Sequence, residues 1–164
     1  MARSGRPAVD TTGRARGTPS ATAGMPSRRV GQPMHVHHDS SSAALVRRQL
    51  WEDLLRAGVP APVVEEAVLV ASELVGNAVR HTPSPGSDLI EVSWGVDGSG
   101  IMLGVTDTGA GVPRTRKPGP RSPSGRGMQI VDALCDGWGV TPRRDGKQVW
   151  AHVPFAAPGP VQQV

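Results

Sequence analysis

A carboxylate and a carboxamide stand one helical turn apart in a stretch that is otherwise mostly apolar. They are Glu73 and Asn77 in the segment SELVGNAVRHT, and side chains four residues apart share one face of a helix. Polar side chains on an apolar helix need partners. Oxygen atoms of this kind suit Mg²⁺, and a carboxylate can accept a proton. We interpret the pair as a metal and nucleotide face. The alternative is a solvated face that continues through Glu66 and Arg80.

A second group follows a predicted strand. Ile101, Leu103 and Val105 alternate with Met102, Gly104 and Thr106, which is typical of a strand with one buried face. The strand ends in Asp107, and Gly109 and Gly111 follow in the segment DTGAGVP. An ionised carboxylate only accepts hydrogen bonds, so it favours a partner with N–H groups, such as the exocyclic amine of adenine. The glycines would let a ligand approach the backbone closely. The alternative is an ordinary Asp-Thr-Gly turn.

A third group opens a predicted helix over residues 125–134. Gly125 and Gly127 stand at its start, in the segment GRGMQIV. Free N–H groups and the dipole at a helix N-terminus favour phosphate oxygens. The chain has no GxxxxGK[ST] motif, and Ile130 replaces the third glycine of a dinucleotide fingerprint. The preceding loop, residues 112–124, carries four basic residues and no acidic one; we interpret it as a lid suited to a triphosphate, or as a solvated loop.

The elements that must position these groups follow from periodicity and from breaking residues. A helix is predicted from the cap candidates at 39–42 to about residue 57, with an apolar side that includes Trp51 and Leu55 and with Asp53 facing water. Trp94, Trp138 and Trp150 are expected in the core or facing a helix. The remaining predicted elements are a short edge strand at 34–38, a helix from about 62 to 81, and strands at 89–97, 101–107, 137–141 and 147–155.

Composition limits the class of protein. The chain has 164 residues, which suits a single core domain, and it has no apolar run long enough for a membrane span. Residues 1–30 contain no apolar core of the kind found in secretory signals, so we expect a cytoplasmic protein. Cys135 is the only cysteine, so an internal disulfide is excluded, and its side chain is expected to be a small buried hydrophobe.

The net charge of +4 comes from an arginine-rich N-terminal segment. Residues 1–30 contain six arginines and one aspartate, so the rest of the chain is close to neutral. We expect residues 1–33 to be a disordered basic arm, residues 34–155 to be the domain, and residues 156–164 to be a flexible tail. The arm could touch RNA, DNA or an acidic partner. Aromatic residues make up only 3% and tyrosine is absent, so the folded part lacks the stacking residues of a nucleic-acid reader.

Taken together and in this order, the three groups resemble the motif boxes of the GHKL ATPase superfamily, whose nucleotide-binding domain is the Bergerat fold. The resemblance covers about residues 40–155. The short form with SELVGNAVRHT, DTGAGVP and GRGMQIV is similar to the bacterial anti-sigma-factor serine kinases. It implies an α+β fold, a two-layer sandwich in which helices cover one face of a mixed, mainly antiparallel sheet.

The resemblance also implies roles for individual residues. Glu73 would be the general base, and Asn77 would coordinate Mg²⁺ at the ATP phosphates. Asp107 would accept the adenine amine. The backbone of Gly109 and Gly111 would pack against the base and ribose. The other phosphate contacts implied are Gly125, Arg126, Gly127, Met128, Arg80 and His81. Many relatives place a threonine after the glycine of the last hairpin, whereas Gly146 is followed here by Lys147 and Gln148.

The function implied is that of a cytoplasmic ATP-binding regulator. It would transfer the ATP γ-phosphate to a serine or threonine of an antagonist protein, and it would sequester a sigma factor. Homodimers are common among such relatives. Two alternatives from other classes remain: a non-catalytic module that binds a protein partner under the control of ATP, and a nucleic-acid-binding protein that uses the arginine-rich arm.

Overall fold

The structure is a computed structural model that describes residues 28–81, 89–107, 125–144 and 146–155. Several predicted features lie outside the described residues: Gly109, Gly111, the lid-like loop at 112–124 and the tail at 156–164. The helices are α1 (Ser42–Arg56), α2 (Ala61–His81) and α3 (Gly125–Leu134). The strands are β1 (Arg28–Arg29), β2 (Met34–His37), β3 (Leu89–Val96), β4 (Gly100–Asp107), β5 (Gly137–Arg143) and β6 (Gly146–Pro154).

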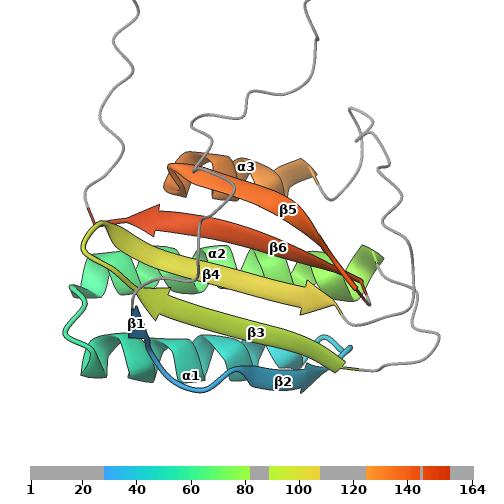
Figure 1. Cartoon of the computed structure of the whole chain (residues 1–164), viewed down its shortest axis with the longest axis horizontal. Helices are drawn as coiled ribbons and strands as arrows, with labels where there is room; N and C mark the ends of the chain where they lie inside the picture. The colour runs from blue at the N-terminus through green and yellow to red at the C-terminus, as the bar shows by residue number, and fades with distance from the viewer. Residues whose placement is uncertain (1–27, 82–88, 108–124, 145, 156–164) are drawn as a thin grey trace, which may run out of the picture.

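The strands form one six-stranded sheet in the order β1-β3-β4-β6-β5, with β2 also paired to β3. Every pair between the described strands is antiparallel. The helices lie together behind the sheet, with α2 between α1 and α3 (Figure 1). The register places Val92, Leu103 and Ala151 on one face of the three central strands, and all three belong to the buried core. The predicted α+β two-layer sandwich is therefore confirmed, although the sheet was expected to be mixed and the described strands pair only antiparallel.

Helix α2 is the centre of the core because apolar residues occupy most of its circumference. Val64, Ala67, Ala71, Leu74 and Ala78 recur at spacings of three and four residues and are buried. The helix contacts α1 on one side, α3 on the other, and strands β3, β4 and β6. A polar side chain on α2 is therefore held by a rigid element, which is what a precisely placed functional group requires.

Helix α1 buries Leu50 and Leu54 of the predicted apolar side, but the rest of its buried face differs from the prediction. Trp51 and Leu55 are exposed, whereas Asp53 is only 5% exposed, so the expectation that Asp53 faces water is wrong. Its carboxylate accepts hydrogen bonds from Gln49 Nε2 at 3.1 Å and from Arg56 Nη1 at 2.8 Å. The segment before β2 covers it: a Cβ added at Gly31 would collide with the carboxylate. Periodicity within α1 could not reveal a neighbour contributed by another segment.

Part of the expected arm belongs to the sheet. Arg28 lies opposite Val96 and Arg29 opposite Gly95, in an antiparallel pair with β3. The expectation that the whole stretch 1–33 is a disordered arm is therefore wrong from residue 28 onward. The physical reason is that an edge strand offers unpaired N–H and C=O groups to any extended segment nearby. Such pairing needs no apolar side chains, so composition gave no sign of it.

The tryptophans divide between the two faces of the sheet. Trp94 is 4% exposed and belongs to the core, as predicted. Trp138 is half exposed and faces α3, where its Nε1 donates to Asp132 Oδ1 at 2.6 Å. Trp150 lies opposite Gly104 and Gly139, on the face away from the helices. The expectation that Trp150 is in the core or faces a helix is wrong, because its neighbours in β6 take the inward positions.

None of the described helices is both long enough and apolar enough to cross a membrane.

Candidate functional site

The fold brings the three predicted groups to one end of the molecule. Helix α2 ends, strand β4 ends and helix α3 begins at the same end of the long axis (Figure 1). Helix α3 runs over Gly125–Leu134, the residues predicted from the sequence. The three groups are far apart in the chain, so their convergence is a property of the antiparallel sheet and of the helix layer packed on it.

Glu73 lies directly against the start of α3. A Cβ added at Gly127 would collide with Glu73 Oε2 and would stand 3.3 Å from Glu73 Cδ. The close approach of the two helices at this point therefore depends on the missing side chain at Gly127. Glu73 is half-buried, and no hydrogen bond or ion pair joins its side chain to any other residue within the described ranges. A partly desolvated carboxylate without a partner is a strong candidate for a functional group.

Asn77 also joins α2 to α3. Its Nδ2 donates to Met128 Sδ at 3.2 Å, and its Oδ1 accepts from Arg80 Nη2 at 3.1 Å. Thus Glu73 and Asn77 meet Gly127 and Met128, and two of the three predicted groups are in contact. Arg80, one turn further along α2, belongs to the same network.

Asp107 occupies the last position of β4 and is only 4% exposed. It shares the helix-facing side of the strand with Leu103 and Val105, because residues two apart in a strand share a face. It lies opposite Ile90 of β3 and Lys147 of β6. Lys147, which follows the glycine of the last hairpin, is therefore a cross-strand neighbour of Asp107. The described contacts do not connect Asp107 to Glu73 or Asn77, and the loop after it is outside the described residues.

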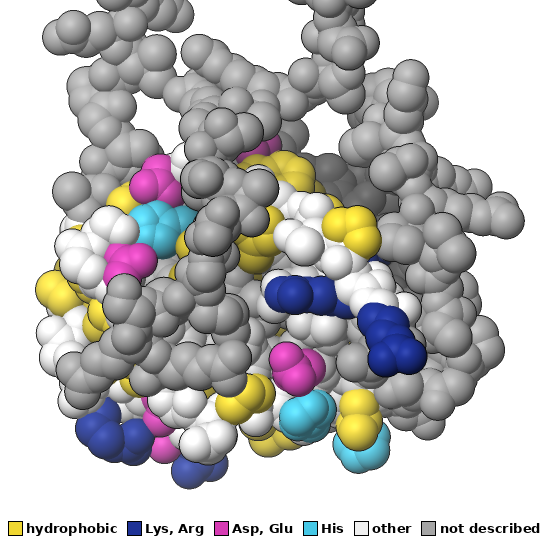
Figure 2. All heavy atoms as spheres, viewed as in Figure 1, with side chains coloured by type: hydrophobic (Ala, Val, Ile, Leu, Met, Phe, Trp, Pro, Cys, Tyr) yellow, Lys and Arg dark blue, Asp and Glu magenta, His cyan; other side chains and the backbone are white. Residues whose placement is uncertain are grey.

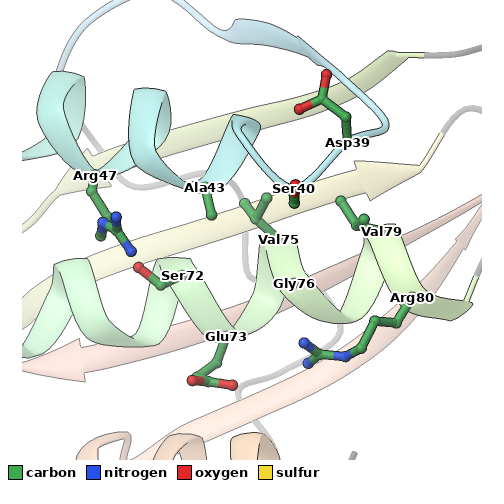
Figure 3. A pocket seen from close by; sticks show the side chains of 10 residues that line it. All are labelled: Asp39, Ser40, Ala43, Arg47, Ser72, Glu73, Val75, Gly76, Val79 and Arg80. Carbon is green, nitrogen blue, oxygen red and sulfur yellow. The ribbon is translucent and has the colours of Figure 1, made fainter.

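A pocket of about 320 Å³ lies beside Glu73, between α2 and the start of α1. Figure 3 shows Arg47 and Ser72 at one end of it and Arg80 at the other, with Glu73 turned toward α3. Asp39 lines it too, and its carboxylate accepts from the backbone N–H of Ser41, just before α1, at 2.7 Å. Hydrogen bonding from the Ser41 hydroxyl lowers the pKa of Asp39 below its ordinary value of 3.8.

Some site residues were missed by the sequence analysis. Asp39, Ser40 and Arg47 line the pocket, and only the packing of α1 on α2 could place them there. Gly76 also lines it. A glycine inside a helix is a signal that could have been used, because it costs stability relative to alanine. For Gly125 and Arg126 the structure describes the backbone but not the environment of the side chains, and the same holds for His81.

On the face drawn in Figure 2, the charges of the described residues are scattered. On the face in Figure 2, the Lys and Arg side chains appear in separate places, with acidic and apolar side chains between them. The described residues on this face therefore form no continuous basic stripe of the kind that follows a nucleic-acid backbone.

Comparison with known proteins identifies the family. The sequence matches the histidine kinase-like ATPase domain over residues 37–153. No curated protein matches the sequence. The chain belongs to the histidine kinase-like ATPase domain family, because the match covers more than half of it. This confirms the resemblance to GHKL ATPases, and it implies that the domain binds ATP.

The solved structures similar to the chain include the following two. The structure of the RsbU and RsbW domains of Rv1364c from Mycobacterium tuberculosis has a TM-score of 0.56 at 22% identity, and the similarity covers 77% of this chain and 34% of that one. The histidine kinase domain of the blue-light activated histidine kinase from Erythrobacter litoralis EL346 has a TM-score of 0.49 at 19% identity, covering 73% and 62%. The chain therefore spans about a third of the length of the first and less than two thirds of the second. At this identity the first likeness supports the fold alone.

Proposed function

We propose that the protein is an ATP-dependent serine/threonine kinase of the anti-sigma-factor type. It transfers the γ-phosphate of ATP to a serine or threonine hydroxyl of an antagonist protein, and it sequesters a sigma factor in a nucleotide-dependent way. The observation that carries this proposal is the half-buried Glu73, which lacks a hydrogen-bond partner among the described residues and lies against Gly127 at the start of α3. That is where a base for phosphoryl transfer should stand.

The described residues fit Mg²⁺ and a triphosphate. Asn77 offers a carboxamide oxygen, an acceptable ligand for Mg²⁺, which in nucleotide sites keeps few protein ligands and takes others from phosphates. Gly125 and Gly127 open α3, and the first N–H groups of a helix have no partner within the helix, so they suit phosphate oxygens. Arg126, Met128, Arg80 and His81 complete the proposed phosphate contacts. When bound, Mg²⁺ would neutralise part of the charge on the phosphates.

The transfer step assigns a separate task to each side chain. The hydroxyl oxygen of the acceptor forms a bond to the γ-phosphorus, and its proton passes to Glu73. The bond between the γ-phosphorus and the bridging oxygen breaks, and ADP leaves with that electron pair. Asp107 selects adenine by accepting its exocyclic amine, while Gly109 and Gly111 provide close backbone approach. Little covalent chemistry is asked of the protein, so positioning and charge compensation carry most of the rate.

The partner proteins are proposed from the family branch that the motifs resemble. The first similar structure includes an RsbW domain beside an RsbU domain, which is consistent with a regulatory kinase that works with protein partners. A sigma factor and an anti-sigma-factor antagonist are the proposed partners, and a homodimer is the proposed assembly. The cytoplasm is the proposed location.

Replacing Glu73 by glutamine tests the catalytic part of the proposal. The carboxamide keeps the size of the side chain but cannot take the proton. We expect Mg·ATP affinity within about twofold of the wild type by calorimetry, with ATP turnover or transfer lost. If turnover is unchanged, Glu73 is not the base. If the wild type itself binds ATP, lacks turnover and still regulates its partner, the protein is the non-catalytic ATP-controlled module instead.

Replacing Asp107 by asparagine tests the nucleotide assignment. The carboxamide can turn an N–H toward the adenine amine, so we expect Mg·ATP binding to weaken strongly in calorimetric titrations. Equal binding of GTP by the wild type would contradict the assignment of adenine. Deleting residues 1–27 tests the nucleic-acid alternative separately. If that alternative is right, the deletion abolishes DNA or RNA binding and leaves ATP binding intact.

A further inference from the structure

The guanidinium of Arg80 folds back along α2 onto the proposed magnesium ligand. Its Nη2 donates to Asn77 Oδ1 at 3.1 Å. A Cβ added at Gly76 would stand 3.2 Å from Nη1 and 3.4 Å from Nη2, which is tighter than most real Cβ contacts. Figure 3 shows the Arg80 side chain extended along the helix in the direction of Glu73. The glycine at position 76 thus provides the space in which the guanidinium lies, which accounts for a residue that otherwise weakens a helix.

The orientation of the Asn77 carboxamide is fixed from both sides. Its Nδ2 donates to Met128 Sδ at 3.2 Å, and a thioether sulfur can only accept a hydrogen bond. The amide nitrogen therefore points toward α3, and Oδ1 is the atom that points toward Arg80. The oxygen that would coordinate Mg²⁺ is the same oxygen that a cationic side chain already binds.

We propose that Arg80 and Mg²⁺ bind Asn77 Oδ1 in alternation, so that Mg²⁺ gains this oxygen only together with a triphosphate. The proposal rests on the nucleotide site proposed above. A guanidinium in contact with Oδ1 repels a divalent cation that approaches the same atom. A triphosphate removes the conflict because its oxygens offer Arg80 a stronger partner than a neutral carboxamide. Arg80 thereby couples metal binding to nucleotide binding. When metal is present without nucleotide, the guanidinium stays on Asn77 Oδ1 and disfavours metal binding to that atom.

The direct test is metal binding without nucleotide, with Mn²⁺ as a paramagnetic probe for Mg²⁺. The full chain is titrated with Mn²⁺ and free metal is followed by electron paramagnetic resonance. We expect Arg80→Ala and Arg80→Gln to bind Mn²⁺ about threefold tighter than the wild type or more, since both remove the competing charge. Adding Asn77→Ala to Arg80→Ala should remove the gain, because the gain depends on Oδ1.

Arg48→Ala is the matched control. Arg48 is an exposed arginine on α1 that pairs with Glu52 at 3.2 Å, so its loss changes the net charge equally without touching Asn77. We expect its Mn²⁺ affinity to equal that of the wild type. The proposal is overturned if Arg80→Ala binds Mn²⁺ no more tightly than the wild type, or if Arg48→Ala gives the same gain.

A second measurement separates this inference from the proposed function. Calorimetry with ATP in excess EDTA should show ATP binding weakened about tenfold in Arg80→Ala, because the phosphates lose the guanidinium as a partner. Unchanged ATP binding would contradict the proposed move of the Arg80 guanidinium from Asn77 to the triphosphate. Failure of the wild type to bind Mg·ATP would refute the nucleotide site itself. The Mn²⁺ titration contains no nucleotide, so its outcome is independent of that failure.

Discussion

Replacing Gly127 by alanine should separate catalysis from folding. The added methyl would overlap Glu73 Oε2 and stand 3.3 Å from Cδ. Because ordinary contact begins near 3.5 Å, the carboxylate oxygen must withdraw by about 1 Å. Glu73 can do this by turning about its own side-chain bonds, since the overlapping atom is the far end of a flexible chain.

The two effects of this substitution differ in size. Alanine is favoured over glycine inside a helix by about 1 kcal/mol, so the free energy of unfolding should change by no more than about that amount. A displacement of about 1 Å at a reacting group can lower a rate by about 100-fold. We therefore expect near-normal stability with a large loss of ATP turnover.

The assay combines three measurements on one preparation. Urea unfolding gives the free energy of unfolding, calorimetry gives Mg·ATP affinity, and phosphate release gives turnover. Gly98→Ala is the matched control, because a Cβ at Gly98 meets no atom within 4 Å. An ATP turnover rate in Gly127→Ala equal to that of the wild type would refute the reasoning. A loss of several kcal/mol in the free energy of unfolding would also refute it, because it would mean that Glu73 cannot move aside.

Three further predictions follow from burial and local space. Leu74→Ala should lower the free energy of unfolding by about 2–5 kcal/mol, whereas Leu69→Ala on the same helix, at a site 44% exposed, should cost less than about 1 kcal/mol; equal losses in urea would contradict the assigned core face. Burial raises the pKa of Cys135 to about 12, so the native thiol should resist iodoacetamide at pH 8, and labelling at the rate of a free thiol would show that it is accessible. Gly76→Ala should stabilise the protein by up to about 1 kcal/mol, because only the movable guanidinium of Arg80 stands near the new methyl; destabilisation in urea would show that the guanidinium cannot yield.

Except for β1, the elements of the fold could be predicted from the sequence because each has a local cause. Helix α3 begins and ends at the predicted residues, and α2 and β4 differ from prediction by one residue at their starts. In each case a regular apolar period is bounded by glycine or proline, or by a polar residue that ends it. The three motif groups were also visible locally, since they depend on residue types at short spacings.

Contacts between segments were decided by the tertiary structure. The burial of Asp53 depends on a segment that precedes β2, and the pairing of Arg28 and Arg29 with β3 depends on an unpaired strand edge. Neither contact leaves a trace in the period of its own element. The outward position of Trp150 likewise follows from the register with Gly104 and Gly139, which a single strand does not specify.

The same division holds at the site. The sequence by itself determined that Glu73 and Asn77 share one face of α2 and that Gly127 opens a helix, because those relations lie within single helices. Only packing decided that Glu73 meets Gly127, that Asn77 meets Met128 and that Arg80 turns back to Asn77 Oδ1. Local spacing fixes which side chains an element offers on a face; which atoms they meet depends on neighbours far away in the chain.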